Sequence, residues 1–209
     1  MNKQKILILS PHTDDGELGC GGSINRFVDE GKEVHYIAFS ICEESVPEGL
    51  PKDTLKKECE KATATLGIKP ENVNFQYFPV RKFNFHRQEI LEVLIQFRNK
   101  LKPDLVFMPS STSIHQDHIT IYNEGIRAFK TTSCLGYDLP WDSRNFPTKT
   151  FIKLDKKNID VKWNALLKYE SQGKRDYFDK EFIVGLSRVR GAQIAKRYAE
   201  AFEVINWIE

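Results

Sequence analysis

Short apolar segments alternate with longer amphipathic segments along most of this 209-residue chain. The apolar runs predict strands at residues 6–9, 34–39, 73–78, 105–108, 134–138 and 150–154. The amphipathic segments between them predict helices at residues 22–30, 52–66, 87–100 and 119–129. Strands that alternate with helices are typical of a parallel sheet covered on both faces. The pattern therefore predicts an α/β fold, a Rossmann-like three-layer αβα sandwich with a mostly parallel sheet.

The C-terminal third of the chain is less regular. Residues 159–169 and 182–201 are predicted helices, and residues 202–207 are a predicted last strand. The stretch 136–148 shows no clear element. Because no internal repeat or low-complexity linker interrupts the chain, we expect a single domain over residues 1–209.

Composition narrows the classes of function. The chain carries 31 Lys and Arg against 29 Asp and Glu, a formal net charge of +2, with no long basic stripe, so a nucleic-acid partner is not expected. No apolar stretch approaches the ~20 residues of a membrane helix, and no signal peptide precedes the first strand. The four cysteines lack a C-x-x-C spacing and are expected to be reduced. A cytoplasmic location follows from these features.

The segment SPHTDDGELGCGG at residues 10–22 directly follows the first predicted strand. In an open α/β sheet the ends of the strands are where a site is built. One imidazole and two carboxylates, from His12, Asp14 and Asp15, can hold a zinc ion and leave one group free as an acid or base. The alternative is a solvated turn that caps the following helix.

A second polar segment, residues 109–118, follows the predicted strand at residues 105–108 in the same way. The carboxyl ends of parallel strands share one edge of the sheet, so the two loops can meet. A catalytic zinc ion typically has three protein ligands and one open position. His12, Asp15 and His118 would make one such set.

The remaining polar side chains of the two loops suit the chemistry of hydrolysis. Asp14 is placed to accept a proton from a water molecule that the ion activates. His115, if protonated and held by Asp117, could stabilise an oxyanion or protonate a leaving nitrogen.

These two loops resemble the motifs of the PIG-L/LmbE-like zinc-dependent deacetylases, which act on N-acetylglucosamine-type sugars. The family's first motif is a Pro/Ala-His-Pro-Asp-Asp-Glu run before a glycine-rich helix start, and residues 11–22 are similar to it. The second motif, His-x-Asp-His, is matched by residues 115–118. The resemblance implies one zinc ion per chain held by His12, Asp15 and His118. It also implies the roles of the remaining motif residues: Asp14 as general base, His115 as electrostatic or acid partner, and Asp117 as the residue that orients His115.

Two positions depart from the family pattern. Thr13 stands in place of the usual proline, and Gly16 in place of the usual glutamate, with Glu17 one position later. A glutamate shifted by one position points in another direction, so Glu17 is not assigned the role of the family glutamate. None of the implied ligands is lost.

Substrate contacts are predicted from position alone. Arg81, after the third strand, could bind a sugar hydroxyl or phosphate, or it could be a surface cation. Trp141 could stack on a sugar ring or pack in the core, and Arg188 could reach the mouth of the site. The glycines at residues 19–22 lack the dinucleotide fingerprint and are expected to allow close packing, with Cys20 as a small buried residue.

The resulting hypothesis is a zinc-dependent hydrolase that removes the acetyl group from a small N-acetyl amino sugar or its conjugate. One alternative is a zinc hydrolase that acts on a different N-acyl amide, and another is a catalytically silent sugar- or metal-binding protein. Other divalent metals suit the same ligands. Relatives of this kind often associate, so a homo-oligomer is also expected.

Overall fold

The computed structural model describes residues 3–208; residues 1, 2 and 209, the ends of the predicted domain, lie outside it. The strands are β1 (Lys5–Ser10), β2 (Glu33–Ala38), β3 (Val73–Phe75), β4 (Leu105–Pro109), β5 (Ser133–Tyr137), β6 (Thr150–Leu154) and β7 (Tyr198–Asn206). The α-helices are α1 (Asp15–Asp29), α2 (Thr54–Leu66), α3 (Arg87–Leu101), α4 (Gln116–Ala128), α5 (Lys156–Leu166) and α6 (Lys180–Ala192).

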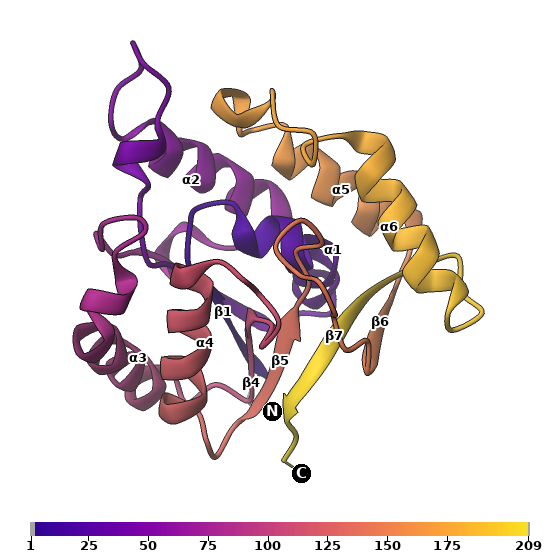
Figure 1. Ribbon diagram of the computed structural model, residues 1–209. Helices are drawn as coiled ribbons and strands as arrows, with labels where there is room; N and C mark the ends of the chain where they lie inside the picture. The colour runs from indigo at the N-terminus through magenta and orange to yellow at the C-terminus, as the bar shows by residue number, and fades with distance from the viewer. Residues whose placement is uncertain (1–2, 209) are drawn as a thin grey trace.

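Within residues 3–208 the strands form one seven-stranded sheet in the order β3-β2-β1-β4-β5-β7-β6. The pairs from β3 to β5 are parallel, whereas β7 runs antiparallel to both β5 and β6. Helices α3 and α4 cover one face, and α1, α2, α5 and α6 lie on the other (Figure 1). The predicted three-layer α/β sandwich with a mostly parallel sheet is confirmed.

The central strands are apolar on both faces because helices cover both. In β1, the side chains of Ile6 and Ile8 pack into the core cluster with α1, and those of Leu7 and Leu9 pack into the cluster with α3 and α4. All four side chains are almost fully buried. Continuous apolar character, rather than alternation, is what a strand buried on both faces requires.

Helix α1 begins seven residues earlier than the sequence predicts and bends at Cys20, whose φ of −145° is not helical. The second half of the helix starts against a buried carboxylate, because Glu200 accepts hydrogen bonds from the backbone N–H groups of Gly22 and Ser23 at 3.0 and 2.7 Å. Lys162 neutralises Glu200 at 2.7 Å. An anion at a helix N-terminus satisfies donors that have no partner inside the helix.

The glycine-rich part of α1 is a packing surface, as predicted. A Cβ atom on Gly19 would lie 2.4 Å from the ring of Tyr137, and one on Gly22 would lie 2.6 Å from Leu154. Cys20, which lies between these two glycines in the sequence, is fully buried, as expected. The helix can therefore approach the sheet closely only because these positions lack side chains.

The boundary between the last helix and the last strand was predicted wrongly. Helix α6 ends at Ala192, and residues 198–201, predicted as helix, belong to β7. The chain turns sharply at Gly191, where a Cβ atom would lie 2.7 Å from the backbone nitrogen of Tyr198, and at Ala195, which has a φ of 53°. Strand β7 lies between two other strands, and residues on both of its faces are buried. A strand of this kind lacks the alternation of apolar and polar residues that would distinguish it from a buried helix.

Among residues 3–208, no helix combines the length and the apolar character needed to cross a bilayer.

The close approach of α1 to the sheet predicts a specific instability. Substituting Gly19→Ala forces the new methyl group into the Tyr137 ring, so we expect the free energy of unfolding to fall by about 1–3 kcal/mol. Denaturant unfolding measures this change. Gly185→Ala is the matched control, because that glycine lies in α6 and a Cβ atom added there would meet no other atom within 4 Å. The control should be neutral or stabilising by about 0.5–1 kcal/mol; equal losses in both variants would contradict the packing argument.

Candidate metal centre and active site

The two polar loops meet because β1 and β4 are neighbouring parallel strands. Their register pairs Ile6 with Leu105 and Ile8 with Phe107, so both strands end at the same edge of the sheet. The chain continues from β1 towards β2 on one side, and from β4 towards β5 on the other. This is a topological switch point, where open α/β sheets bind ligands.

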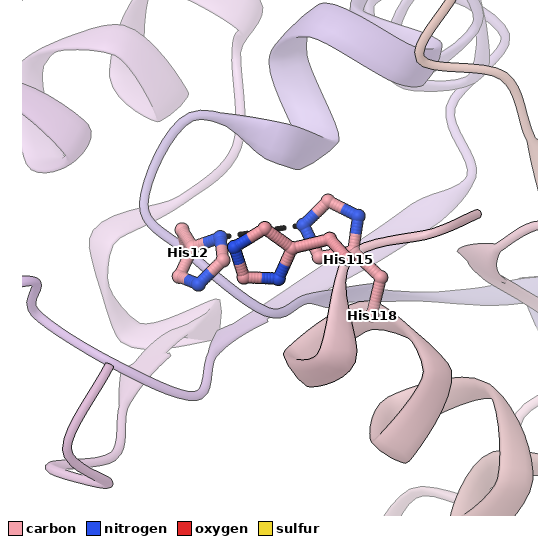
Figure 2. Close-up of side chains that lie close together, drawn as sticks. All are labelled: His12, His115 and His118. Carbon is pink, nitrogen blue, oxygen red and sulfur yellow. Dashed lines mark hydrogen bonds between the residues drawn. The ribbon is translucent and has the colours of Figure 1, made fainter. Parts of the chain in front are cut away.

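Three donor atoms from these loops form a small triangle. His12 Nδ1 lies 3.0 Å from Asp15 Oδ2, and His118 Nε2 lies 3.2 Å from the same oxygen. The two ring nitrogens are 3.3 Å apart, and Figure 2 shows the two imidazoles turned towards each other. Ligand atoms bound tetrahedrally about 2.0–2.1 Å from a zinc ion are separated by about 3.3 Å. The triangle therefore has the dimensions of a zinc ligand set.

The outer ring nitrogens of His12 and His118, those that are not part of the triangle, also have polar partners. His12 Nε2 lies 3.0 Å from Asp117 Oδ2, and His118 Nδ1 lies 3.1 Å from the hydroxyl of Ser113 and 3.6 Å from Asp142 Oδ2. Protons on these outer nitrogens leave the lone pairs of the inner nitrogens facing the Asp15 oxygen. The two nitrogen lone pairs and the carboxylate oxygen repel one another unless a cation lies between them. The donor set therefore fits a divalent metal ion.

The electrostatics of the triangle favour positive charge. Burial lowers the pKa of His12, but the carboxylates of Asp15 and Asp117 outweigh burial and raise this pKa well above its usual value. Burial likewise raises the pKa of Asp15, but His118 and His12 outweigh it and hold this pKa well below its usual value. A proton and a metal ion therefore compete for the same site.

His115 offers a second way to complete the metal site. His12, His115 and His118 each have a donor atom within 4.8 Å of the others, and the His115 ring stacks on His118 with centroids 4.6 Å apart (Figure 2). However, His115 Nδ1 accepts a hydrogen bond from the backbone N–H of Asp117 at 3.2 Å. The neutral ring then carries its proton on Nε2, which makes that atom a donor rather than a ligand. Asp15 is therefore the better third ligand.

The structure corrects two details of the expected roles. Asp117 does not orient the His115 ring through its carboxylate; Oδ2 contacts His12 and accepts the backbone N–H of Arg81 at 2.6 Å. Nor is His115 set up to be protonated, since burial and then the neighbouring His118 and His12 lower its pKa to about 4. His115 is therefore neutral at neutral pH.

Asp14 is the free carboxylate of the site. It directly precedes α1, but its side chain makes no capping hydrogen bond, so the alternative of a simple helix-capping turn does not describe it. Its side chain lines the same cavity as His12, Asp15 and His118. Burial, and then the neighbouring Asp15 carboxylate, raise the pKa of Asp14 to about 6. A carboxylate with this pKa suits a general base near neutral pH.

Of the departures from the family motif, Thr13 lines the cavity, whereas Gly16 and Glu17 do not. A Cβ atom on Gly16 would lie 2.6 Å from the ring of Tyr36, so no larger residue fits there. Glu17 is fully buried, where it contacts the hydroxyls of Tyr36 and Tyr169, and burial raises its pKa to about 8. Both hydroxyls also contact the carbonyl oxygen of Thr13. Glu17 thus supports the loop from behind and does not line the cavity.

The cavity in front of the triangle has a volume of about 200 Å³. Of the predicted substrate contacts, Arg81 and Trp141 line it. Arg188 does not: it lies on α6, with its guanidinium carbon 5.7 Å from the ring centroid of Tyr198. The prediction for Arg188 is therefore wrong, because the turn after α6 directs that part of the chain into β7 instead of back to the site.

Several residues that line the cavity were not predicted from the sequence, and four of them are Asp142, Gln172, Arg175 and Tyr177. Three of them lie in the α5–α6 connector (residues 167–179), and Asp142 lies in the β5–β6 loop (residues 138–149). Neither segment has a repeated spacing or a motif. The one available signal was the polar and aromatic run Arg-Asp-Tyr-Phe at residues 175–178, between two helices.

Comparison with known proteins places the chain in a family. The profile of the PIG-L family, described as GlcNAc-PI de-N-acetylase, matches residues 7–129, which is more than half of the chain and includes both loops. The chain belongs to the PIG-L family. This PIG-L protein is 25% identical over 177 residues to the uncharacterized deacetylase YaiS of Escherichia coli, covering 81% of this chain and 93% of YaiS.

Solved structures agree on the fold of this PIG-L protein. The N,N'-diacetylchitobiose deacetylase of Pyrococcus horikoshii superimposes with a TM-score of 0.81 at 20% identity, covering 98% of this chain and 84% of that one. GalB, the 4-carboxy-2-hydroxymuconate hydratase of Pseudomonas putida KT2440, superimposes with a TM-score of 0.79 at 16% identity, covering 99% and 98%. Because a hydratase has the same fold, the fold alone does not determine the reaction.

The contacts of the triangle predict how metal affinity responds to substitution. His118→Ala removes a donor atom and should abolish tight zinc binding, whereas Asp117→Asn weakens the support of His12 and should lower affinity about 10- to 100-fold. A competition titration with a zinc indicator measures both. His86→Ala is the control, because His86 does not line the cavity. An unchanged affinity in Asp117→Asn would contradict its assignment as the support of His12.

Proposed function

We propose that this protein hydrolyses the acetamide of an N-acetylglucosamine-type amino sugar or conjugate, using one zinc ion held by His12, Asp15 and His118. The observation that carries the proposal is the triangle of donor atoms, with sides of 3.0, 3.2 and 3.3 Å, in one cavity with the carboxylate of Asp14. The description of the family and the substrate in the name of the Pyrococcus horikoshii enzyme support the choice of an N-acetyl sugar.

Two imidazoles and one carboxylate suit zinc, and they leave a coordination position open. When bound, such an ion supplies Lewis acidity for the acetamide carbonyl and lowers the pKa of a ligating water. The protein supplies the fixed geometry: Asp117 and Ser113 hold the two histidine rings through their outer nitrogens. Fixed ligands reduce the reorganisation needed when substrate arrives.

Asp14 acts as the general base. Its carboxylate accepts a proton from the attacking water as the new C–O bond forms, and it then delivers that proton to the sugar nitrogen as the C–N bond breaks. The products are acetate and a free amino sugar. Asp14 suits both steps because its pKa of about 6 lies close to neutral pH.

His115 stabilises the developing oxyanion as a neutral hydrogen-bond donor. Its Nδ1 accepts the N–H of Asp117, so its Nε2–H is available to the cavity. A neutral imidazole with a pKa of about 4 is a poor proton source at neutral pH. We therefore assign protonation of the leaving amine to Asp14 rather than to His115.

The cytoplasmic location, the single domain over residues 1–209 and a homo-oligomeric state stay predictions. A zinc hydrolase for another N-acyl amide and a silent binding protein are the alternatives that experiment must separate.

The decisive experiment measures metal content together with acetate release. We expect about one zinc ion per chain and chelator-sensitive release of acetate from N-acetylglucosamine compounds, restored by added zinc. A panel of other N-acyl amides, assayed in parallel, identifies the first alternative if only those compounds are hydrolysed. Bound zinc without hydrolysis of any amide would point to the binding protein. A chain that binds no metal after loading would refute the proposed site.

The proposed base predicts a pH dependence. Activity should rise with pH as Asp14 loses its proton, with an acid limb in kcat/KM at or below about pH 6, because a bound cation stabilises the carboxylate further. Asp14→Asn should lower kcat by at least about 100-fold with zinc still bound. The profile is measured at saturating zinc, with metal content checked at each pH. Full activity in Asp14→Asn would exclude Asp14 as the base.

A further inference from the structure

Arg175 faces the active-site cavity from the half of the chain that carries no catalytic motif. It lies in the α5–α6 connector, and it lines the same cavity as His12, Asp14 and His118. The two polar loops follow β1 and β4, whereas Arg175 lies more than 50 residues beyond the second of them. Arg175 is therefore a wall residue of the cavity and not part of the metal site.

The position of Arg175 is fixed by aromatic contacts. Its guanidinium donates a hydrogen bond to the hydroxyl of Tyr177, and its guanidinium carbon lies 5.7 Å from the centroid of the same ring. The Tyr177 ring stacks on Trp141 with centroids 4.0 Å apart and planes at 10°. The stack joins the connector to the β5–β6 loop. A side chain held in this way loses less conformational entropy when it binds a ligand.

Within the described part of the chain, Arg175 has no acidic partner. Among residues 3–208, no carboxylate oxygen lies within 4 Å of its guanidinium or of that of Arg81, the second arginine that lines the cavity. Other arginines of the chain are paired, such as Arg190 with Asp138 at 2.9 Å and Arg26 with Glu30 at 2.7 Å. After the bond to Tyr177, the guanidinium keeps several N–H donors in one plane, a geometry that matches a carboxylate or a phosphate.

We infer that Arg175 selects a substrate that carries an anionic group, a carboxylate or a phosphate, on or beside the N-acetylated sugar. This inference rests on the proposed function, since it names the class of sugar that the same cavity accepts. Trp141 and Tyr177 form the aromatic wall that presents the guanidinium. Arg175 is thus a specificity residue, which touches a part of the substrate remote from the acetamide.

A competing role is that Arg175 acts on the reaction through Asp14. Its positive charge opposes the rise in the pKa of Asp14, although burial and Asp15 dominate that pKa. The two roles differ in what they change. Selection of an anion alters the ratio between charged and neutral substrates, whereas an effect through Asp14 alters all substrates equally and moves the acid limb of the pH profile.

The test compares kcat/KM for N-acetylglucosamine with that for its 1-phosphate, its 6-phosphate and N-acetylglucosaminuronic acid. The zinc-loaded wild type should prefer at least one anionic sugar, and the phosphates against the uronate show which anion is recognised. Arg175→Gln should reduce the ratio of anionic to neutral kcat/KM by about 10- to 100-fold. Arg175→Lys, which keeps the charge but loses the planar donors, should reduce it less.

Arg144→Gln is the matched control, because Arg144 is an exposed arginine of the β5–β6 loop that does not line the cavity. It should leave the ratio unchanged. A wild type that shows no preference for any anionic sugar would overturn the inference. So would an Arg175→Gln variant that loses activity equally on all substrates, with a displaced acid limb.

Binding measured by calorimetry separates this inference from the proposed function. If no compound releases acetate, the proposed function fails, but the same four sugars can still be titrated into wild type and Arg175→Gln. Tighter binding of an anionic sugar that is lost in the variant would support the inference without hydrolysis. Equal affinity for charged and neutral sugars would refute it, whatever the outcome for acetate release.

Discussion

The site of this PIG-L protein depends on the parallel pairing of β1 with β4. The pairing places His12 and His118, which are 106 residues apart in the chain, with ring nitrogens 3.3 Å from each other. Helices on both faces bury these strands, so the sheet is a rigid base from which the two loops project. Without this register, His12 and Asp15 of the first loop would not meet His118 of the second. The arrangement is a strict geometric consequence of two parallel strands that end at the same edge.

Two adjacent carboxylates receive opposite electrostatic environments. Asp15 lies against two imidazoles, and their attraction holds its pKa well below the usual range. Asp14 lacks such close partners, and burial beside the charged Asp15 raises its pKa to about 6. A carboxylate that stays ionised suits a metal ligand, and one that exchanges protons near neutral pH suits a base. The difference between these neighbouring residues, on which their proposed roles rest, thus arises from what each side chain contacts.

The two polar loops and the part of the cavity wall that contains Trp141 and Arg175 come from different parts of the chain. Residues 7–129, which match the PIG-L family, contain both polar loops. Trp141, Arg175 and Tyr177 lie beyond this segment, on two long connections that also line the cavity. Such loops can change without disturbing the sheet from which the polar loops project. The same fold occurs in proteins named for different reactions, a deacetylase and a hydratase among them.

The α/β class, most strands and helices and the two polar loops could be predicted from the residue pattern, because hydrophobic periodicity and the placement of loops after strands are local properties of the chain. Tertiary structure alone decided that Asp117 supports His12, that His115 is neutral, and that Arg175 rather than Arg188 lines the cavity. It also decided where α6 ends and β7 begins, since a strand buried on both faces has no periodicity of its own. Hydrogen-bond partners and pKa values depend on distances through space between residues far apart in sequence, and folding sets those distances.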